Sequence, residues 1–226
     1  MKKSDYKILK LTKNKPNECY KNIYFEYPVL GEPSIDKNIK DWSENLFQLV
    51  IKETSEQCLK CREECTKGSD DCCDKYQDYG NWTFDTELDE VVKTKGTVSL
   101  KFIMREYAGG AHSSHDLATR IISNDGKTMN RTDTFTRTEG LREFFSDYCY
   151  RSMYPILKDT WDETPSWPQE GLAPNEKSFK YALITPQGLT LIFPPYQVAS
   201  FAQGEQRCDI PLKELAKFGP KPGIWQ

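Results

Sequence analysis

Cysteine usage is the feature that most constrains this chain, because eight cysteines occur in 226 residues and five of them fall within residues 58–73. This segment reads CLKCREECTKGSDDCC and holds very little apolar content besides its cysteines. An even and high count is typical of proteins exported to an oxidising compartment, where disulfides persist. We therefore expect disulfides among all eight: Cys19, Cys58, Cys61, Cys65, Cys72, Cys73, Cys149 and Cys208.

The parity of the cysteine-rich segment adds a constraint. If all eight cysteines are paired, an odd number inside the segment requires at least one disulfide that leaves it and ties it to the main body. Eight cysteines allow 105 connectivities, and the sequence does not choose among them.

The segment has two interpretations. Cys58, Cys61 and Cys65 stand at i, i+3 and i+7, on one face of a helix, and Cys-x2-Cys is a common half of a zinc site. The second half, however, has adjacent cysteines instead of a matching Cys-x2-Cys, and no histidine lies near it. We favour a small helical hairpin held by disulfides, because a segment this polar cannot make a core of its own.

Hydrophobic periodicity predicts an α+β fold, with antiparallel sheets packed against two main helices. The first helix should begin at the cap Ser34 and bury one apolar face: Ile35, Ile39, Trp42, Leu46, Leu49 and Val50. The second should cover about 138–157. Strands are expected from residue 19, on either side of Lys95-Gly96, before the turn at 124–126, in a hairpin around 185–188, and in QRCDI before a short helix that begins at Pro211.

Two closely packed subdomains are expected from this order of elements. Residues 1–18 are predicted as a loose N-terminal lead-in, 19–95 as an N-terminal α+β subdomain carrying the insert 58–73, and 96–226 as a C-terminal α+β subdomain. Residues 159–175 contain three prolines and two tryptophans, Trp161 and Trp167, and are predicted as an irregular exposed loop.

Charge and hydropathy exclude several classes of protein. Basic and acidic residues are mixed along the chain, with a net charge of −3, so nucleic acid is not expected as a partner. The longest apolar runs are strand-sized, so no membrane span is expected. The cysteine count predicts an exported protein, either periplasmic or lipid-anchored at a cell envelope. We expect that its signal peptide or anchor is absent from the sequence.

Both histidines lie in REYAGGAHSSHD, residues 105–116, and this stretch was the first candidate for chemistry. His112 and His115 are three residues apart, so on an extended strand they would face opposite sides, and no ligand set is completed nearby except by Asp116. We favour a structural bend in which Gly109 and Gly110 permit a bulge and His112 anchors it. No metal or cofactor site is predicted.

Catalytic motifs are also missing from the sequence. There is no Gly-x-Ser-x-Gly elbow, and two histidines leave few ways to build a serine triad. The chain is therefore expected not to be an enzyme, although a carboxylate-dependent hydrolase using residues such as those of DTELDE at 85–90 is kept as a residual alternative.

Four stretches in a fixed order carry a family resemblance: YPVLGEPSIDKNIKDW at 27–42, YAGGAH at 107–112, SNDGKTMNRTDTF at 123–135 and LITPQGLTLIFPPYQVASFAQGEQRCDIPLKEL at 183–215. In this order the chain, over residues 19–218, resembles the extracytoplasmic domain family found in RsiV, a lysozyme-binding anti-sigma factor, and in the non-catalytic part of PdaC, a peptidoglycan deacetylase. The insert at 58–73 is not part of the shared pattern, and this chain has no transmembrane helix or sigma-binding segment.

The resemblance implies an α+β binding module of the bacterial envelope. Its Pro-x-Tyr turn, implicated in lysozyme contact in RsiV, matches Pro194 and Tyr196 here, with Pro195 between them. We therefore expect a lysozyme-like muramidase as the partner, bound by occlusion of its active site, with Trp161 and Trp167 as possible further anchors. The alternative is a module that binds peptidoglycan glycan directly by stacking on exposed aromatic rings.

Overall fold

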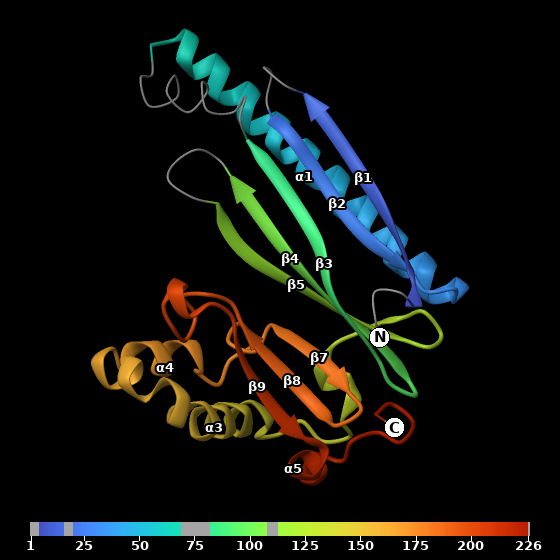
Figure 1. Ribbon diagram of the computed structural model, residues 1–226, viewed down its shortest axis with the longest axis vertical. Coiled ribbons are helices and arrows are strands. Elements are labelled where there is room, and N and C mark those ends of the chain that lie inside the picture. The colour runs from blue at the N-terminus through green and yellow to red at the C-terminus, as the bar shows by residue number, and fades with distance from the viewer. Residues whose placement is uncertain (1–4, 16–19, 69–81, 108–112, 226) are drawn as a thin grey trace. The chain divides into compact units, whose positions relative to one another are not determined.

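A computed structural model describes residues 5–15, 20–68, 82–107 and 113–225, and its contacts divide the chain into two compact units (Figure 1). One unit comprises residues 2–89 and 102–116, and the other residues 90–101 and 117–226. The α+β class is confirmed. The sequence predicted one subdomain boundary, between residues 95 and 96. The contacts divide the chain differently, because the long strands that follow residue 82 each contribute residues to both units.

The first unit is built from two strands, a long helix and parts of three more strands: β1 (Lys7–Lys15), β2 (Tyr20–Val29), α1 (Pro33–Thr66), β3 (Thr83–Lys93), β4 (Thr97–Tyr107) and β5 (Ser114–Ser123). With β6 (Thr128–Met129) these strands form one sheet in the order β1-β2-β3-β4-β5-β6. Aromatic and aliphatic side chains from β2, from α1 and from the residue before β3 fill its core: Tyr20, Ile23, Phe25, Phe47, Val50 and Trp82.

Two expectations for this unit are corrected. Part of the expected lead-in, Lys7–Lys15, is strand β1, which pairs antiparallel with β2 through backbone hydrogen bonds that do not depend on its Lys- and Asn-rich side chains. The sheet is also not wholly antiparallel. β2 and β3 pair in parallel, because α1 connects them and carries the chain back to the starting edge.

Helix α1 is the predicted first helix and continues through the first three cysteines of the insert. Ser34 is not its cap: Pro33 occupies the first helical turn, and the Asp36 carboxylate accepts hydrogen bonds from the backbone N–H groups of residues 30–32. Leu49, expected on the apolar face, is 47% exposed, since the buried stripe instead passes through Phe47 and Val50.

The second unit packs a three-stranded antiparallel sheet, β7 (Tyr181–Thr185), β8 (Gly188–Phe193) and β9 (Gln206–Pro211), with helix α3 (Leu141–Glu163) (Figure 1). The strand hairpin and the second helix are confirmed. The remaining short elements are η2 (Arg131–Thr134), α4 (Ser166–Gly171), η3 (Phe201–Gln203), α5 (Leu212–Leu215) and η4 (Ala216–Phe218), and Pro211 precedes α5 as its N-cap.

Residues 159–175 are not an irregular exposed loop. Helix α3 continues to Glu163 and α4 follows it, because the buried side chains of α3 recur every four residues well past the expected end: Leu141, Phe145, Cys149, Met153, Leu157 and Trp161. No helix among the described residues is long and apolar enough to cross a membrane.

Candidate functional site

The β8–β9 loop, residues 194–205, carries the predicted contact turn. Phe193 ends the fully buried strand β8, and the chain reverses at once: the Tyr196 N–H donates to the Ala199 carbonyl at 2.9 Å, and the Gln197 N–H to the Pro194 carbonyl at 3.1 Å. Pro194 and Pro195 are half-buried and have their φ angles set by their rings. The turn is therefore tight and conformationally restricted.

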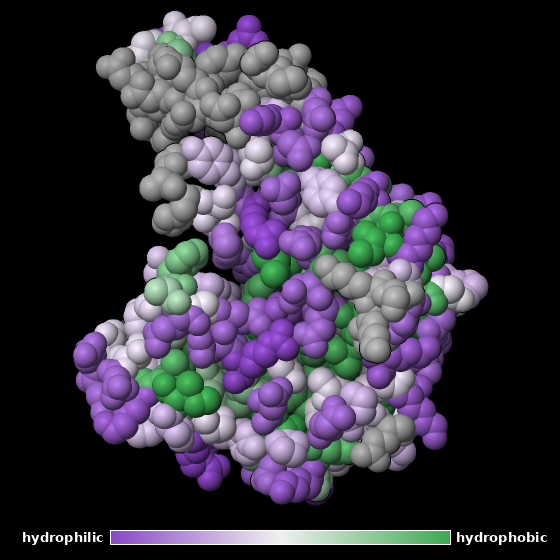
Figure 2. All heavy atoms as spheres, in the orientation of Figure 1, coloured by the Kyte–Doolittle hydropathy of each residue, from purple (hydrophilic) through white to green (hydrophobic). Residues whose placement is uncertain are grey.

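Tyr196 projects from this turn into solvent. Its side chain is 61% exposed, and its ring stacks on that of Phe201, itself 37% exposed, with centroids 5.6 Å apart and planes inclined by 29°. Pale green, apolar side chains stand out at the left of Figure 2, where Figure 1 draws the orange-red segment of this loop. Large apolar rings are seldom left in water without reason when they stand together. The Tyr196–Phe201 pair is the candidate contact surface.

The backbone of Tyr196 is held in an unfavourable conformation. Its φ is +71°, the sole positive φ of a non-glycine residue within the part of the chain described. For a side chain with a Cβ, this left-handed region costs about 1–2 kcal/mol. Such a conformation persists when the surrounding structure determines it, and it is frequently found where a side chain must be presented to a ligand.

Replacing Tyr196 by glycine should therefore stabilise the fold slightly. We expect Tyr196→Gly to raise the midpoint of thermal unfolding by about 2–4 °C, since relief of the positive φ outweighs the entropy that glycine adds to the unfolded chain. Differential scanning calorimetry measures this, with Tyr196→Ala as the matched control, because alanine removes the same ring but keeps the Cβ. If the glycine variant unfolds at a lower temperature than the alanine variant, the backbone of Tyr196 is not strained.

Buried and partly buried hydrogen bonds hold the turn from behind. The Gln197 side-chain amide donates to the Gly171 carbonyl at 2.9 Å and to the Ser178 carbonyl at 2.7 Å. The Trp161 indole N–H donates to the Val198 carbonyl at 2.7 Å. Gly171 has no room for a side chain, since a Cβ there would lie 2.0 Å from the Gln197 carbonyl oxygen. The turn is thus fixed before any partner arrives.

The second half of the loop is fixed as well. Ser200 and Gln203 form a reciprocal capping box, and the Gln203 amide donates to the Thr160 hydroxyl of α3 at 2.8 Å. At the end of the loop, Glu205 forms an ion pair with Lys101 of β4, whose side chain is 3% exposed, with 2.5 Å between the charged atoms. Both halves of the loop are therefore attached to regular structure.

Acidic side chains occupy the end of α3 that contacts this loop. Asp159 and Glu163 flank Thr160 closely in sequence and are exposed. Asp162 accepts hydrogen bonds from Lys158 and from Tyr154, and these bonds hold the pKa of its carboxyl below the usual range. Three acidic side chains thus stand next to the attachment point of the loop.

The two tryptophans expected as anchors differ in exposure, and only Trp161 is too buried to be one. Trp161 is 2% exposed and lies in the core, stacked against Tyr150 with 5.3 Å between ring centroids, so it supports the turn and offers no contact surface. Trp167 is half-buried and packs against the same core. The four-residue spacing from Leu141 to Trp161 was the sequence signal that could have placed Trp161 inside.

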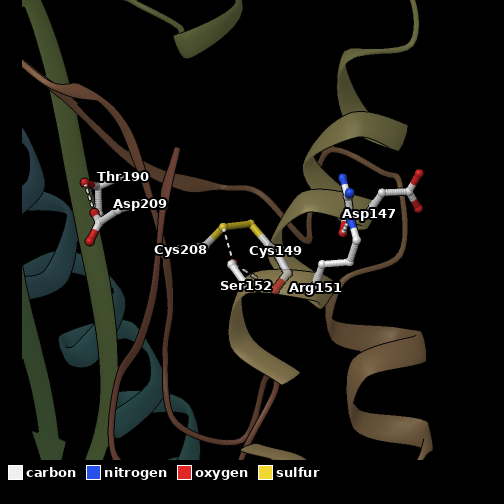
Figure 3. The surroundings of a disulfide bond; sticks show 7 residues. All are labelled: Asp147, Cys149, Arg151, Ser152, Thr190, Cys208 and Asp209. Atoms are coloured by element: carbon white, nitrogen blue, oxygen red, sulfur yellow. Dashed lines mark hydrogen bonds between the residues drawn. A yellow bond between two sulfur atoms is a disulfide. The ribbon is translucent and has the colours of Figure 1, made fainter. Parts of the chain in front are cut away.

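A disulfide joins helix α3 to strand β9. Cys149 of α3 and Cys208 of β9 are bonded, and both are fully buried, with Ser152 in contact with the Cys208 sulfur (Figure 3). Cys58, Cys61 and Cys65 are also disulfide-bonded, and none of the described cysteines is a free thiol. Cys19, Cys72 and Cys73 lie outside the described residues. With one pair known, the remaining six cysteines allow 15 connectivities.

The glycine-histidine bend cannot be placed in the same way. Gly109, Gly110 and His112 lie outside the described residues, and His115 is an exposed residue of β5. Over the stretches that are described, no group of three or more His, Cys, Asp or Glu side chains could hold a metal ion.

The comparison with known proteins identifies the family. A model of proteins of unknown function, DUF3298, matches residues 100–213, half of the chain. The chain belongs to the DUF3298 family. The matched region contains the β8–β9 loop, α3 and both cysteines of the 149–208 disulfide. The cysteine-rich insert precedes it.

Two solved DUF3298 structures share the fold. A family member from Bacteroides fragilis is 15% identical with a TM-score of 0.54, and the alignment covers 96% of this chain and 94% of that one. A family protein from Pseudomonas aeruginosa is 14% identical with a TM-score of 0.57, covering 97% and 96%. No curated protein matches the chain. At these identities the likeness extends to the fold of the DUF3298 proteins alone.

Proposed function

We propose that this protein is a binding module of the bacterial cell envelope, without catalytic activity, and that its partner is a lysozyme-like muramidase. The contact surface is the Tyr196–Phe201 pair. The observation that carries the proposal is that Tyr196 is exposed, held at a positive φ, and placed on a turn that the side-chain hydrogen bonds of Gln197 and Trp161 support.

The energetics of such a surface favour tight binding to a protein. Tyrosine is among the residues that most often contribute a large share of interface energy when they enter a pocket of the partner. Because the turn is already ordered, little conformational entropy is lost on association. A narrow projection with an aromatic tip is the shape required to enter and block the cleft of an enzyme.

Charge supports a basic partner. The chain has a net charge of −3, and Asp159 and Glu163 stand on the part of α3 that contacts the loop. Complementary charge around an interface accelerates association and disfavours partners of the same sign. The resemblance of the Phe-x-Pro-Tyr-x-Val segment to the RsiV domain supports a muramidase in particular.

An envelope location is supported by the cysteines. Disulfides persist outside the cytosol, and every described cysteine is oxidised. Both solved relatives come from bacteria. The 149–208 disulfide lies within the second unit and connects α3, which contacts the loop through Thr160, with β9, which follows the loop.

Loss of the tyrosine ring should abolish most of the affinity. We expect Tyr196→Ala to weaken binding to a lysozyme by about thirtyfold or more, the loss typical of a central aromatic contact. Isothermal titration calorimetry with lysozymes of several types measures this. Ile156→Ala is the matched control, because Ile156 is 79% exposed on α3 but lies outside the loop. Wild-type protein that binds no muramidase would overturn the proposal, and equal affinities of the two variants would overturn the site.

A stacked pair of exposed rings also suits a sugar, so direct binding of peptidoglycan glycan is the second candidate. The two candidates differ in their response to salt. Affinity for a basic protein should fall as ionic strength rises from 50 to 500 mM, whereas stacking on a neutral glycan should change little. Titration with soluble peptidoglycan fragments under both conditions separates them.

A further inference from the structure

A small basic pocket lies on the second unit, apart from the β8–β9 loop. It is lined by residues from β5, β6, η2 and the start of β7, and has a volume of about 130 Å³. The side chains that matter here are Thr119, Arg120, Thr128, Asn130, Arg131 and Lys180, which we call the basic pocket. A cavity of this size holds several water molecules, and a small polyatomic ion therefore fits.

The charge of the lining is one-sided. Arg120, Arg131 and Lys180 all line the basic pocket, and no carboxylate is among the lining residues that the structure describes. Two acidic groups stand next to it. Glu176 accepts from Arg131 at 2.9 Å but is shared with Arg142, and the Asp133 carboxylate accepts from the Asn130 backbone N–H at 2.7 Å.

Arg131 provides the observation that points to a ligand. Its side chain is 6% exposed, and its Nε is buried without a hydrogen-bond partner in the structure. A buried cation whose donors are not all hydrogen-bonded costs free energy, and an anion in the pocket that Arg131 lines would reduce this cost. Burial also lowers the pKa of both Arg131 and Arg120, because each guanidinium has lost contact with water.

The other donors are arranged around the same space. Arg120 donates to the Thr128 hydroxyl at 2.7 Å, and this bond orients its guanidinium at the pocket. Lys180 is exposed and forms no ion pair with a carboxylate of the described residues. It lies against the Tyr181 ring, with its Nζ 2.8 Å from the phenol oxygen and 4.7 Å from the ring centroid. Guanidinium groups beside a lysine and hydroxyl donors form the usual recognition set for a tetrahedral oxyanion.

We propose that the basic pocket binds a small oxyanion of the phosphate and sulfate class. The ion would accept hydrogen bonds from Arg131 and Arg120 and lie among the three cationic side chains that line the pocket. This site is separate from the contact loop, and the proposal does not depend on the proposed function.

The test is a titration of the full chain with inorganic phosphate and with sulfate, using chloride at the same ionic strength as the reference. Backbone amide chemical shifts are followed by NMR spectroscopy. We expect saturable changes at Thr119, Thr128, Arg131 and Lys180 with both oxyanions and none with chloride. Changes that are the same in all three salts, or that do not saturate, would overturn the site.

Variants then assign the donors. Lys180→Gln should weaken phosphate binding by about two- to fivefold, as for an exposed ion pair, whereas the matched control Lys177→Gln, exposed and outside the pocket, should leave it unchanged. Arg131→Gln should weaken it by about tenfold or more. If Arg131→Gln does not fold, the test rests on the two lysine variants. Equal phosphate affinities of Lys180→Gln and Lys177→Gln would then overturn the proposal.

The source of the anion is distinguished by a diester. Dimethyl phosphate has the oxyanion of a phosphodiester in an anionic polymer, with two oxygens already esterified. A site for polymer-borne phosphate binds it as well as inorganic phosphate, and a site for the free ion binds inorganic phosphate more tightly. If the protein binds neither dimethyl phosphate nor inorganic phosphate, the oxyanion assignment is wrong. The muramidase proposal would be unaffected.

Discussion

Removal of the 149–208 disulfide should lower the free energy of unfolding by about 4 kcal/mol. The bond closes a loop with a sequence separation of 59 residues, and a cross-link of that span restricts the unfolded chain by about this amount. The double variant Cys149→Ala/Cys208→Ala leaves no thiol that could pair wrongly with the insert. Both side chains are fully buried, so small cavities at the two sites would add to the loss.

Urea unfolding followed by circular dichroism measures this loss. Ser152→Ala is the matched control, since the Ser152 hydroxyl contacts the Cys208 sulfur at 3.7 Å but makes no covalent bond, and it should cost less than 1 kcal/mol. A loss in the double variant below that of the control would contradict the proposed cross-link effect. In the wild-type chain, a thiol count under denaturing conditions should find no free thiol at the five described cysteines, and eight free thiols would contradict their oxidised state.

Truncation of Trp161 should have an effect of similar size and reach the contact surface as well. Trp161→Ala is expected to cost about 3–5 kcal/mol, because it leaves a large cavity against the Tyr150 and Tyr154 rings and removes the donor to the Val198 carbonyl. Trp161→Phe keeps most of the volume and should cost only about 1–3 kcal/mol through the unsatisfied carbonyl.

The comparison residue is the second tryptophan of the same stretch. Trp167 is half-buried, so Trp167→Ala should cost clearly less than Trp161→Ala in the same chemical unfolding experiment. Trp161→Phe should also weaken partner binding although Trp161 is not at the surface, since the Tyr196 turn loses one of its supports. Equal destabilisation by the two alanine variants would contradict the placement of Trp161 in the core and of Trp167 at its edge.

Most of the helices and strands could be predicted from the sequence because their signals are local. Helix α1 follows from the three- and four-residue spacing after residue 34, and the β7–β8 hairpin from two apolar runs around Gly188. The errors arose where composition was weighed above periodicity. The prolines of 159–175 obscured the four-residue stripe that continues to Trp161, and the lysines of 7–15 obscured strand β1.

The candidate site was predictable in part. Exposure of Tyr196 followed from its place after Pro194 and Pro195 and from the family resemblance, but its positive φ and its contact with Phe201 did not. The supports of the turn come from Gly171, Ser178 and Trp161, which are 19 to 37 residues away in sequence from the groups they contact. No spacing rule within a short window connects residues so far apart.

The sequence by itself determined the α+β class, the amphipathic helices, the hairpin and an oxidised set of cysteines, because each of these depends on residues within one or two turns of helix or on a simple count. Only the tertiary structure decided that Cys149 pairs with Cys208, that β2 and β3 run parallel, that Trp161 is core and Tyr196 is surface, and that three cations meet in one pocket. Pairing and burial are settled by contacts between distant segments, and those contacts exist only once the chain has packed.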